Sequence, residues 1–370
     1  MKNLIIFSFL LLLSYASYSQ DIWVKYNNHK STEKSDTGVF VFNPYSTAFF
    51  DDKEFTSNIK KGYTHPGYFL QPMIKYQPNK RSRFSAGFHT MYFAGADSVE
   101  KIVPIVSLEV KLIEGLEMIL GSIHSKQMHF LPEPIFKPER LYINQPEVGV
   151  QFLTNTEKIK LDSWTNWERY IKNGSPFQEV FTMGFSGIAK PSSFDDRSGL
   201  LINFFGIGVH HGGQIDSTNL PVNTTINLGA GFSYSFPIKT GKSVFGLDIT
   251  GFLSSDKSPN PTSKYQNGNA VYPKIFIESE TFRGEIGYFH ATKFVNPRGE
   301  ELFGSYSTVN STFDSDIRNL YTAKFIYSVE VAKGFNLGAR FDTYYDPKNS
   351  LFDWAFTFRM VFDRDILLKK

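Results

Sequence analysis

Two adjacent histidines followed by two glycines stand out in GVHHGGQID, residues 208–216. These residue types, with the carboxylate that ends the segment, could form a metal or catalytic centre. A zinc site, however, needs three or four converging ligands, and no further His or Cys lies at motif spacing from His210 and His211. We therefore interpret the pair as rim residues at the end of a strand, where Gly212 and Gly213 let the chain turn into a loop.

The N-terminal segment has the features of a secretory signal peptide. Lys2 precedes an apolar run over residues 4–15, and the small-residue stretch ASYS follows. We predict a signal peptide over residues 1–19 and a mature chain from Gln20. No later segment approaches the roughly 20 apolar residues that a membrane-spanning helix needs. The sequence therefore excludes a helical membrane protein.

The composition narrows the remaining classes. The chain of 370 residues contains no cysteine, so it carries neither a disulfide framework nor a lipidated cysteine. Its formal net charge is only +3, which gives no reason to expect a nucleic-acid partner. It is rich in Phe (37), Tyr (19) and Gly (28), which suits strands with one apolar and one polar face.

The clearest alternation lies near the C-terminus, in LFDWAFTFRMVF, residues 351–362. Its apolar side consists of Phe352, Trp354, Phe356, Phe358, Met360 and Phe362. Its other side consists of Asp353, Ala355, Thr357 and Arg359. A lipid-facing surface this aromatic at the end of the chain is typical of transmembrane β-barrels.

The same alternation of apolar and polar residues recurs along the chain. It predicts 16 antiparallel strands, or 14 if the first strand does not pair. The predicted strands are 38–42, 66–76, 82–93, 101–112, 116–124, 147–154, 158–168, 177–188, 199–210, 224–236, 243–254, 270–280, 282–294, 319–331, 335–345 and 351–362. Short and long connections alternate, as periplasmic turns and extracellular loops do. We predict a single all-β outer-membrane barrel over residues 20–370, with residues 20–37 as a periplasmic lead-in.

The densest aromatic cluster outside the lipid faces is LDSWTNWERY, residues 161–170. One interpretation places Trp164 in the lumen, where its ring could stack on a sugar. The other, which we favour, places Trp167 and Tyr170 in the aromatic girdle and packs Trp164 against a loop folded into the barrel. The proline-rich loop 126–145 is long and stiff enough to fold inward as a constriction of the mouth. The candidate solute contacts are Asp162, Trp164, Asn166, Glu168, Arg340, Asp342 and Arg359.

The other charged residues give little direct evidence of chemistry. Lumen-facing acids and bases are balanced in number, so most are expected to form cross-strand ion pairs. The acidic segment DDKE, residues 51–54, lacks the ligand spacing of an EF-hand calcium loop and is interpreted as a solvated turn. No phosphate-binding glycine motif or serine nucleophile elbow is present. We expect no cofactor, no metal and no enzyme activity.

Three segments resemble a family of outer-membrane barrel proteins typical of Bacteroidetes. They are residues 62–97, residues 161–187 and HHGGQID at 210–216. The resemblance covers most of the mature chain and fades before about His65. It implies a porin-like barrel at the cell surface and assigns no substrate or catalytic residue.

We expect a porin-like outer-membrane channel for small polar solutes. The alternative is a closed or plugged barrel that serves as a structural or accessory subunit of a cell-surface complex. The expected partners are outer-membrane lipids and small polar solutes, with a surface lipoprotein or a second copy of the chain as further candidates. The expected location is the cell outer membrane.

Overall fold

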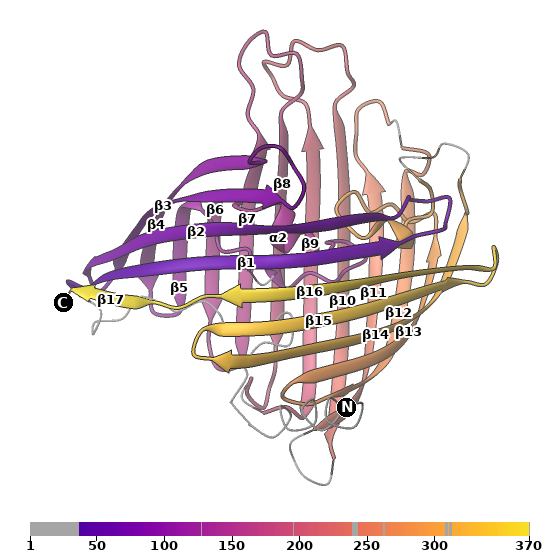
Figure 1. The fold of residues 1–370 in the computed structure, drawn as a ribbon. Coiled ribbons are helices and arrows are strands. Elements are labelled where there is room, and N and C mark those ends of the chain that lie inside the picture. Colours follow the sequence, from indigo (N-terminus) through magenta and orange to yellow (C-terminus); the bar gives the residue numbers. More distant parts are fainter. Residues whose placement is uncertain are drawn as a thin grey trace.

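The computed structural model describes residues 37–369 except 127, 195, 239–242, 262, 308–309 and 311–312; the predicted signal peptide lies outside these described residues. The fold is a closed antiparallel β-barrel (Figure 1). Its strands are β1 (Phe40–Glu54), β2 (Tyr63–Asn79), β3 (Ser82–Phe93), β4 (Lys101–Ile113), β5 (Leu116–Ser122), β6 (Val148–Asn155), β7 (Ile159–Arg169), β8 (Val180–Ala189), β9 (Gly199–His211), β10 (Asn223–Pro237), β11 (Val244–Asp256), β12 (Asn267–Glu278), β13 (Phe282–Thr292), β14 (Ile317–Ala332), β15 (Phe335–Asp346), β16 (Leu351–Phe362) and β17 (Ile366–Lys369).

The barrel closes through β1, which pairs with β2 on one side and with β16 on the other. The short β17 continues along β1 beyond the end of β16, with Phe42 opposite Ile366. β16 and β17 thus form one interrupted strand of the wall, and the ring has 16 positions, each strand pairing with its neighbour in sequence. The predicted 16-stranded barrel is confirmed. An even number of strands places both ends of the barrel chain on the same, periplasmic side.

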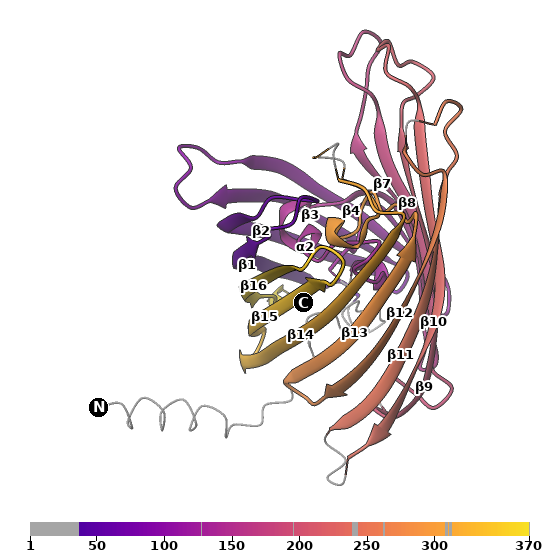
Figure 2. The same cartoon turned by 90° about the vertical axis from the view of Figure 1, so that its right-hand side faces the viewer.

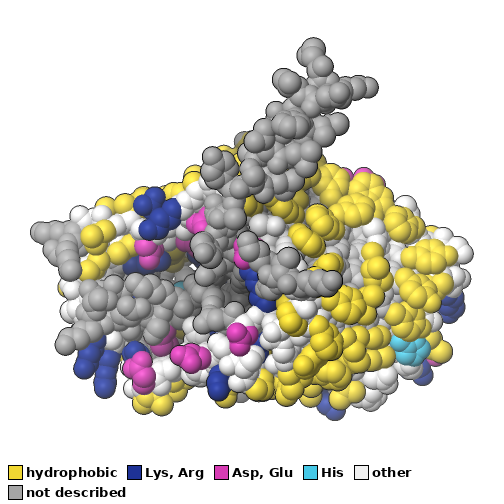
Figure 3. Space-filling view, turned by 90° about the horizontal axis from the view of Figure 1, so that it is seen from below, with side chains coloured by type: hydrophobic (Ala, Val, Ile, Leu, Met, Phe, Trp, Pro, Cys, Tyr) yellow, Lys and Arg dark blue, Asp and Glu magenta, His cyan; other side chains and the backbone are white. Residues whose placement is uncertain are grey.

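Alternating side chains produce the two faces of the wall. In β16, Asp353 and Thr357 are buried inside, whereas Phe352 and Phe358 are more than half exposed on the outside. Seen from below, hydrophobic side chains cover much of the outer surface (Figure 3). This outer face suits contact with lipid acyl chains. Among the described residues, no helix is long and apolar enough to cross a bilayer.

The first strand differs from its prediction. β1 runs over 15 residues, Phe40–Glu54, instead of ending at Phe42, and β2 begins at Tyr63. The acidic segment 51–54 is therefore part of the wall, and its interpretation as a solvated turn is wrong. Its inward side chains, Asp51 and Lys53, are only 2% and 6% exposed, respectively.

Two long connections on the extracellular side fold into the barrel. The first inner loop, residues 123–147, follows the short strand β5 and contains η3 (Met128–Phe130) and α2 (Arg140–Ile143). The second inner loop, residues 293–316, contains η4 (Glu301–Phe303). Both ribbon views place α2 within the ring of strands (Figures 1 and 2). The predicted inward folding of the proline-rich loop is confirmed.

Candidate functional site

The two inner loops pack against each other inside the lumen. The backbone N–H of Lys137 donates to the carbonyl of Arg298 at 2.9 Å, and that of Glu300 donates to the carbonyl of Glu133 at 3.0 Å. Apolar side chains from both loops are almost fully buried there: Ile135, Phe136, Leu302 and Phe303. The lumen therefore contains a hydrophobic core, to which the loops and inward side chains of the wall such as Phe69 and Phe289 both contribute.

The first inner loop also contacts the barrel wall through ion pairs and hydrogen bonds of more than one of its residues. Lys126 pairs at 2.5 Å with Asp363, which lies between β16 and β17. Glu133 accepts from Lys324, from Arg340 at 3.0 Å and from Tyr344 at 2.5 Å. Because these partners lie on different strands, the loop acts as a plug held by charge at several points around the barrel.

A cluster of charged side chains surrounds Lys53, on the inner face of β1. Its ammonium group lies 2.7 Å from Glu139 of the first inner loop and 2.8 Å from Glu300 of the second. Burial alone would raise the pKa of Glu139, but Lys53 and Lys137 outweigh it and hold that pKa well below its usual range. Lys53 therefore joins the wall to both loops.

Next to Lys53 on the same face of β1, Asp51 faces a histidine. Its register partner on β2 is His65, so the two side chains project into the lumen side by side. The hydroxyl of Thr357 donates to Asp51 Oδ1 at 2.6 Å. Within the described part of the chain, Asp51 Oδ2 and His65 Nδ1 are buried without a hydrogen-bond partner that meets standard geometry. An acid and a base with spare hydrogen-bonding capacity thus lie opposite each other.

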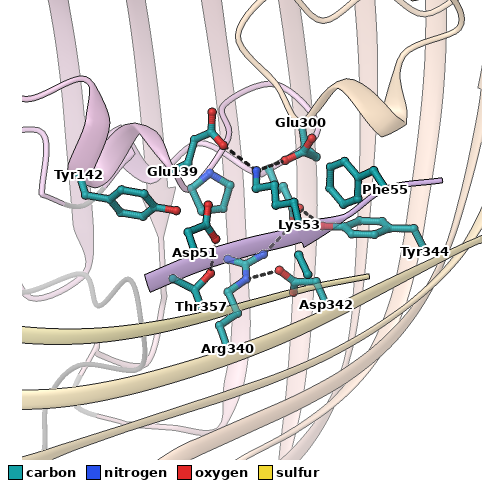
Figure 4. Close-up of a pocket in the computed structure, with 13 residues that line it drawn as sticks. Asp51, Lys53, Phe55, Glu139, Tyr142, Glu300, Arg340, Asp342, Tyr344 and Thr357 are labelled. Carbon is teal, nitrogen blue, oxygen red and sulfur yellow. Dashed lines mark hydrogen bonds and ion pairs between the residues drawn. The ribbon is translucent and has the colours of Figure 1, made fainter. Parts of the chain in front are cut away.

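Tyr142 of α2 lies beside the acid of this pair. Its hydroxyl points toward Asp51, as Figure 4 shows. Burial, and then the negative charge of Asp51, raises the pKa of Tyr142 well above its usual value. Tyr142 therefore keeps its proton and acts as a hydrogen-bond donor. The cavity between this helix and the wall holds about 20 Å³, which is room for about one water molecule.

Asp51 links two neighbouring sets of groups, because it faces His65 across the strand pair and also lines the cavity with Lys53 and Tyr142. His65 can exchange a proton, Asp51 can stabilise an imidazolium, and Lys53 and Tyr142 can donate to a developing negative charge. Together these are the parts that general acid–base hydrolysis requires. Among the described residues there is no group of three or more His, Cys, Asp or Glu side chains that could hold a metal ion.

The residues proposed from sequence as solute contacts do not gather in one part of the lumen. Trp164 stacks on His129 of the first inner loop, with ring centroids 3.8 Å apart, which confirms that it packs against a folded-in loop. Trp167 and Tyr170 are exposed on the outside, as the girdle interpretation predicts. The remaining candidates are distributed as follows: Asp162, Asn166 and Glu168 on β7 beside Trp164, Arg340 and Asp342 at the cavity near Lys53, and Arg359 half-buried on β16.

The adjacent histidines of the opening motif lie at the end of β9. The ring of His210 faces outward, where its Nδ1 lies 2.8 Å from Thr224 Oγ1 and its ring centroid 4.8 Å from that of Phe181. His211 alternates to the inner face. Gly212 follows with φ of +107°, a conformation that favours glycine, so the strand ends there as predicted.

Replacing both His210 and His211 with Asn is expected to leave insertion and folding unchanged, with at most a small loss of stability. Side chains near the membrane interface contribute less than those at the midplane. Heat-modifiable migration on a gel measures the folded fraction. Loss of the folded band in this variant would show that the pair has a larger structural role.

Solved structures with a similar fold come from outer-membrane proteins. OccK5 (OpdH) of Pseudomonas aeruginosa superposes with a TM-score of 0.53 at 10% identity, covering 91% of this chain and 100% of that one. OccK2 (OpdF) of the same organism, in complex with glucuronate, gives 0.51 at 9% identity, covering 90% and 100%. A loop-deletion mutant of OmpT, an outer membrane protein of Vibrio cholerae, gives 0.52 at 10% identity, covering 88% and 100%. These similarities support an outer-membrane type of barrel with a channel-like wall.

Sequence comparison identifies the family. Among curated proteins none matches this chain. A family model described as lipid A 3′-O-deacylase-type, however, matches residues 12–370. That description names an enzyme, so the expectation of no enzyme activity is wrong. Because the match covers nearly the whole chain, the protein belongs to the lipid A 3′-O-deacylase-type family.

Proposed function

We propose that the protein is an outer-membrane hydrolase that removes an ester-linked acyl chain from a lipid A-like glycolipid. The observation that carries this proposal is the facing pair of Asp51 and His65, which lies beneath the first inner loop. Each has a buried atom without a hydrogen-bond partner among the described residues. Family membership supplies the class of substrate.

The proposed reaction assigns one role to each of these groups. His65 takes a proton from water, whose oxygen bonds to the ester carbonyl carbon. Lys53 and Tyr142 are placed to donate to the carbonyl oxygen as it becomes negative, which stabilises the tetrahedral intermediate. The bond between that carbon and the alkoxy oxygen then breaks, and His65 returns its proton to the leaving alcohol. Asp51 stabilises the transient imidazolium.

The cavity has room for only about one water molecule, so in this proposal the acyl ester enters when the first inner loop lifts. The same loop carries Glu139 and Tyr142, and its closure therefore brings donors to the site and excludes bulk water. This design separates substrate entry from catalysis. It also gives a role to the ion pairs of Lys53, which join the wall to both inner loops.

The test is direct measurement of acyl release. The purified, folded protein is incubated with lipid A vesicles, and free fatty acid and residual lipid are measured by mass spectrometry. We expect time-dependent loss of one ester-linked chain. If the folded protein leaves lipid A unchanged at every ratio of protein to lipid, the proposal is wrong.

Passage of small polar solutes is a second candidate function. It is favoured by the width of a 16-stranded wall, whose interior is filled only when the two inner loops pack against the inward side chains of the wall. The structural neighbour OccK2 was solved with glucuronate, a small polar solute.

Deleting residues 127–144 is expected to raise single-channel conductance in planar bilayers, because the deletion removes most of the plug. Intact protein serves as the control. Larger, stable conductance steps in the shortened chain would support a pore. A silent barrel in both forms, co-purifying with a surface lipoprotein, would contradict the channel and favour an accessory subunit.

A further inference from the structure

The ring of His129, in the first inner loop, packs against side chains of the barrel wall, away from the Asp51–His65 site. It stacks on Trp164 with an interplanar angle of 6° and a centroid distance of 3.8 Å. Its Nδ1 lies 2.8 Å from Asp162 Oδ2, and its Nε2 lies 2.9 Å from Glu147 Oε2. The side chain is fully buried. Every polar atom of this ring is thus held by an oppositely charged group.

Contacts within the wall itself hold Asp162 and Trp164 in position, without a contribution from His129. Gln151 of β6 donates to both oxygens of Asp162, at 2.9 and 3.0 Å, which fixes the carboxylate. Gly184 of β8 lies against the indole, and a Cβ there would be only 2.4 Å from the Trp164 ring. The missing side chain lets the indole lie flat and present its other face to the lumen. The surface that contacts the His129 ring, formed by Trp164 and Asp162, is therefore part of the barrel wall.

The loop is strained where it supplies its ring. Met128, His129 and Phe130 have φ values of +51°, +51° and +55°, in the left-handed region. Residues other than glycine rarely adopt this conformation, because their Cβ atom crowds the backbone. Burial would lower the pKa of His129, but Asp162 and Glu147 outweigh it and raise the pKa to about 9, so the ring is a cation at neutral pH. Binding of a planar cation by this wall offsets the strain.

We propose that Trp164, Asp162 and Glu147 form a binding site for a planar organic cation with N–H donors on opposite edges, and that His129 occupies it as a resident ligand. The site would take an imidazolium or guanidinium group of a solute or substrate once the part of the first inner loop around His129 withdraws, while Glu147 stays at the start of β6, where its carbonyl accepts from the N–H of Ile123. An aromatic face selects a flat cation through cation–π attraction, and two carboxylates select N–H donors at the edges. This proposal goes beyond the hydrolase function and does not depend on it.

The test replaces the resident ligand with a soluble one. In the folded His129→Ala variant, imidazolium at pH 6 is titrated by calorimetry, with methylguanidinium as a second probe. We expect saturable binding of both, and a rise in the unfolding temperature of the variant that the wild type does not show. Tetramethylammonium, which is neither flat nor an N–H donor, is the matched control cation and should bind more weakly than either probe, because only cation–π and charge attraction remain.

Two further variants decide whether the wall is the receptor. His129→Ala combined with Trp164→Leu, or with Asp162→Asn, is expected to weaken imidazolium binding about tenfold or more. If His129→Ala fails to fold, deletion of residues 127–144 removes the same ring and leaves the wall intact for the same titration. Absence of saturable binding in every folded variant, or equal binding with and without Trp164, would overturn the proposal. Acyl release is not used as a readout, so the outcome is distinct from that of the hydrolase test.

Discussion

Replacing His65 with glutamine is expected to lower the rate of acyl release by about 10²- to 10⁴-fold, the usual contribution of a general base. Glutamine keeps the size and polarity of the side chain but cannot take a proton from water. His65 lies half-buried beside Tyr63 and Phe93, which a glutamine can also contact, so the barrel should still fold. The measurement is fatty-acid release from lipid A vesicles, normalised to folded protein.

The matched control for this substitution is the double variant of His210 and His211 to Asn. Those histidines lie on β9, outside the proposed catalytic set, and their replacement should leave the rate near that of the wild type. A third variant, Asp51→Asn, should lower the rate while retaining the fold, because the imidazolium loses its facing carboxylate. Equal rates for His65→Gln and the wild type would show that the base lies elsewhere.

Replacing both Phe356 and Phe358 with lysine is expected to prevent stable insertion of the barrel. Both side chains project from the outer face of β16, where Phe358 is 57% exposed to the surroundings. A lysine on the lipid face costs roughly 2–4 kcal/mol near the bilayer midplane. Two such charges on one strand approach the whole stability of a typical domain, about 5–15 kcal/mol. The folded fraction is read from heat-modifiable migration on a gel.

The control for the lysine variant changes both phenylalanines to leucine, which keeps an apolar surface. That variant should fold almost completely. A lysine double variant that folds as well as the leucine one would mean that this face of β16 does not contact lipid. The register assigned to the last strand would then be wrong.

The wall could be predicted from sequence wherever its two faces differ in polarity. β16 is the clearest example, because aromatic residues alternate with Asp353 and Thr357. β1 lacks this contrast. Its outer positions include Ser46, Ala48 and Asp52, and its inner positions mix Phe49 with charged residues. The prediction from alternation alone therefore ended the first strand too early and placed Asp51 and His65 in a loop.

The candidate site itself could not be derived from local pattern. Glu133 and Arg340 are 207 positions apart, and only closure of the barrel brings their side chains together. The stacking of His129 on Trp164 depends in the same way on how the first inner loop enters the lumen. Sequence reasoning placed Trp164 and Asp162 on the inner face and predicted an inward loop, but which loop residue fills their site depends on the tertiary structure. Lys53 and His65 gave no motif signal, since each is a single polar residue on a mixed strand.

The central claim is that this barrel hydrolyses an acyl ester of lipid A through the site at Asp51 and His65. Its most direct test is mass spectrometry of lipid A extracted from outer membranes of bacteria that produce either the wild-type chain or His65→Gln, with equal amounts of folded barrel. Hydrolysis predicts a lipid A species lighter by one ester-linked acyl chain in the wild-type membranes, and its near absence in the variant. Identical lipid A profiles in both membranes would contradict the claim.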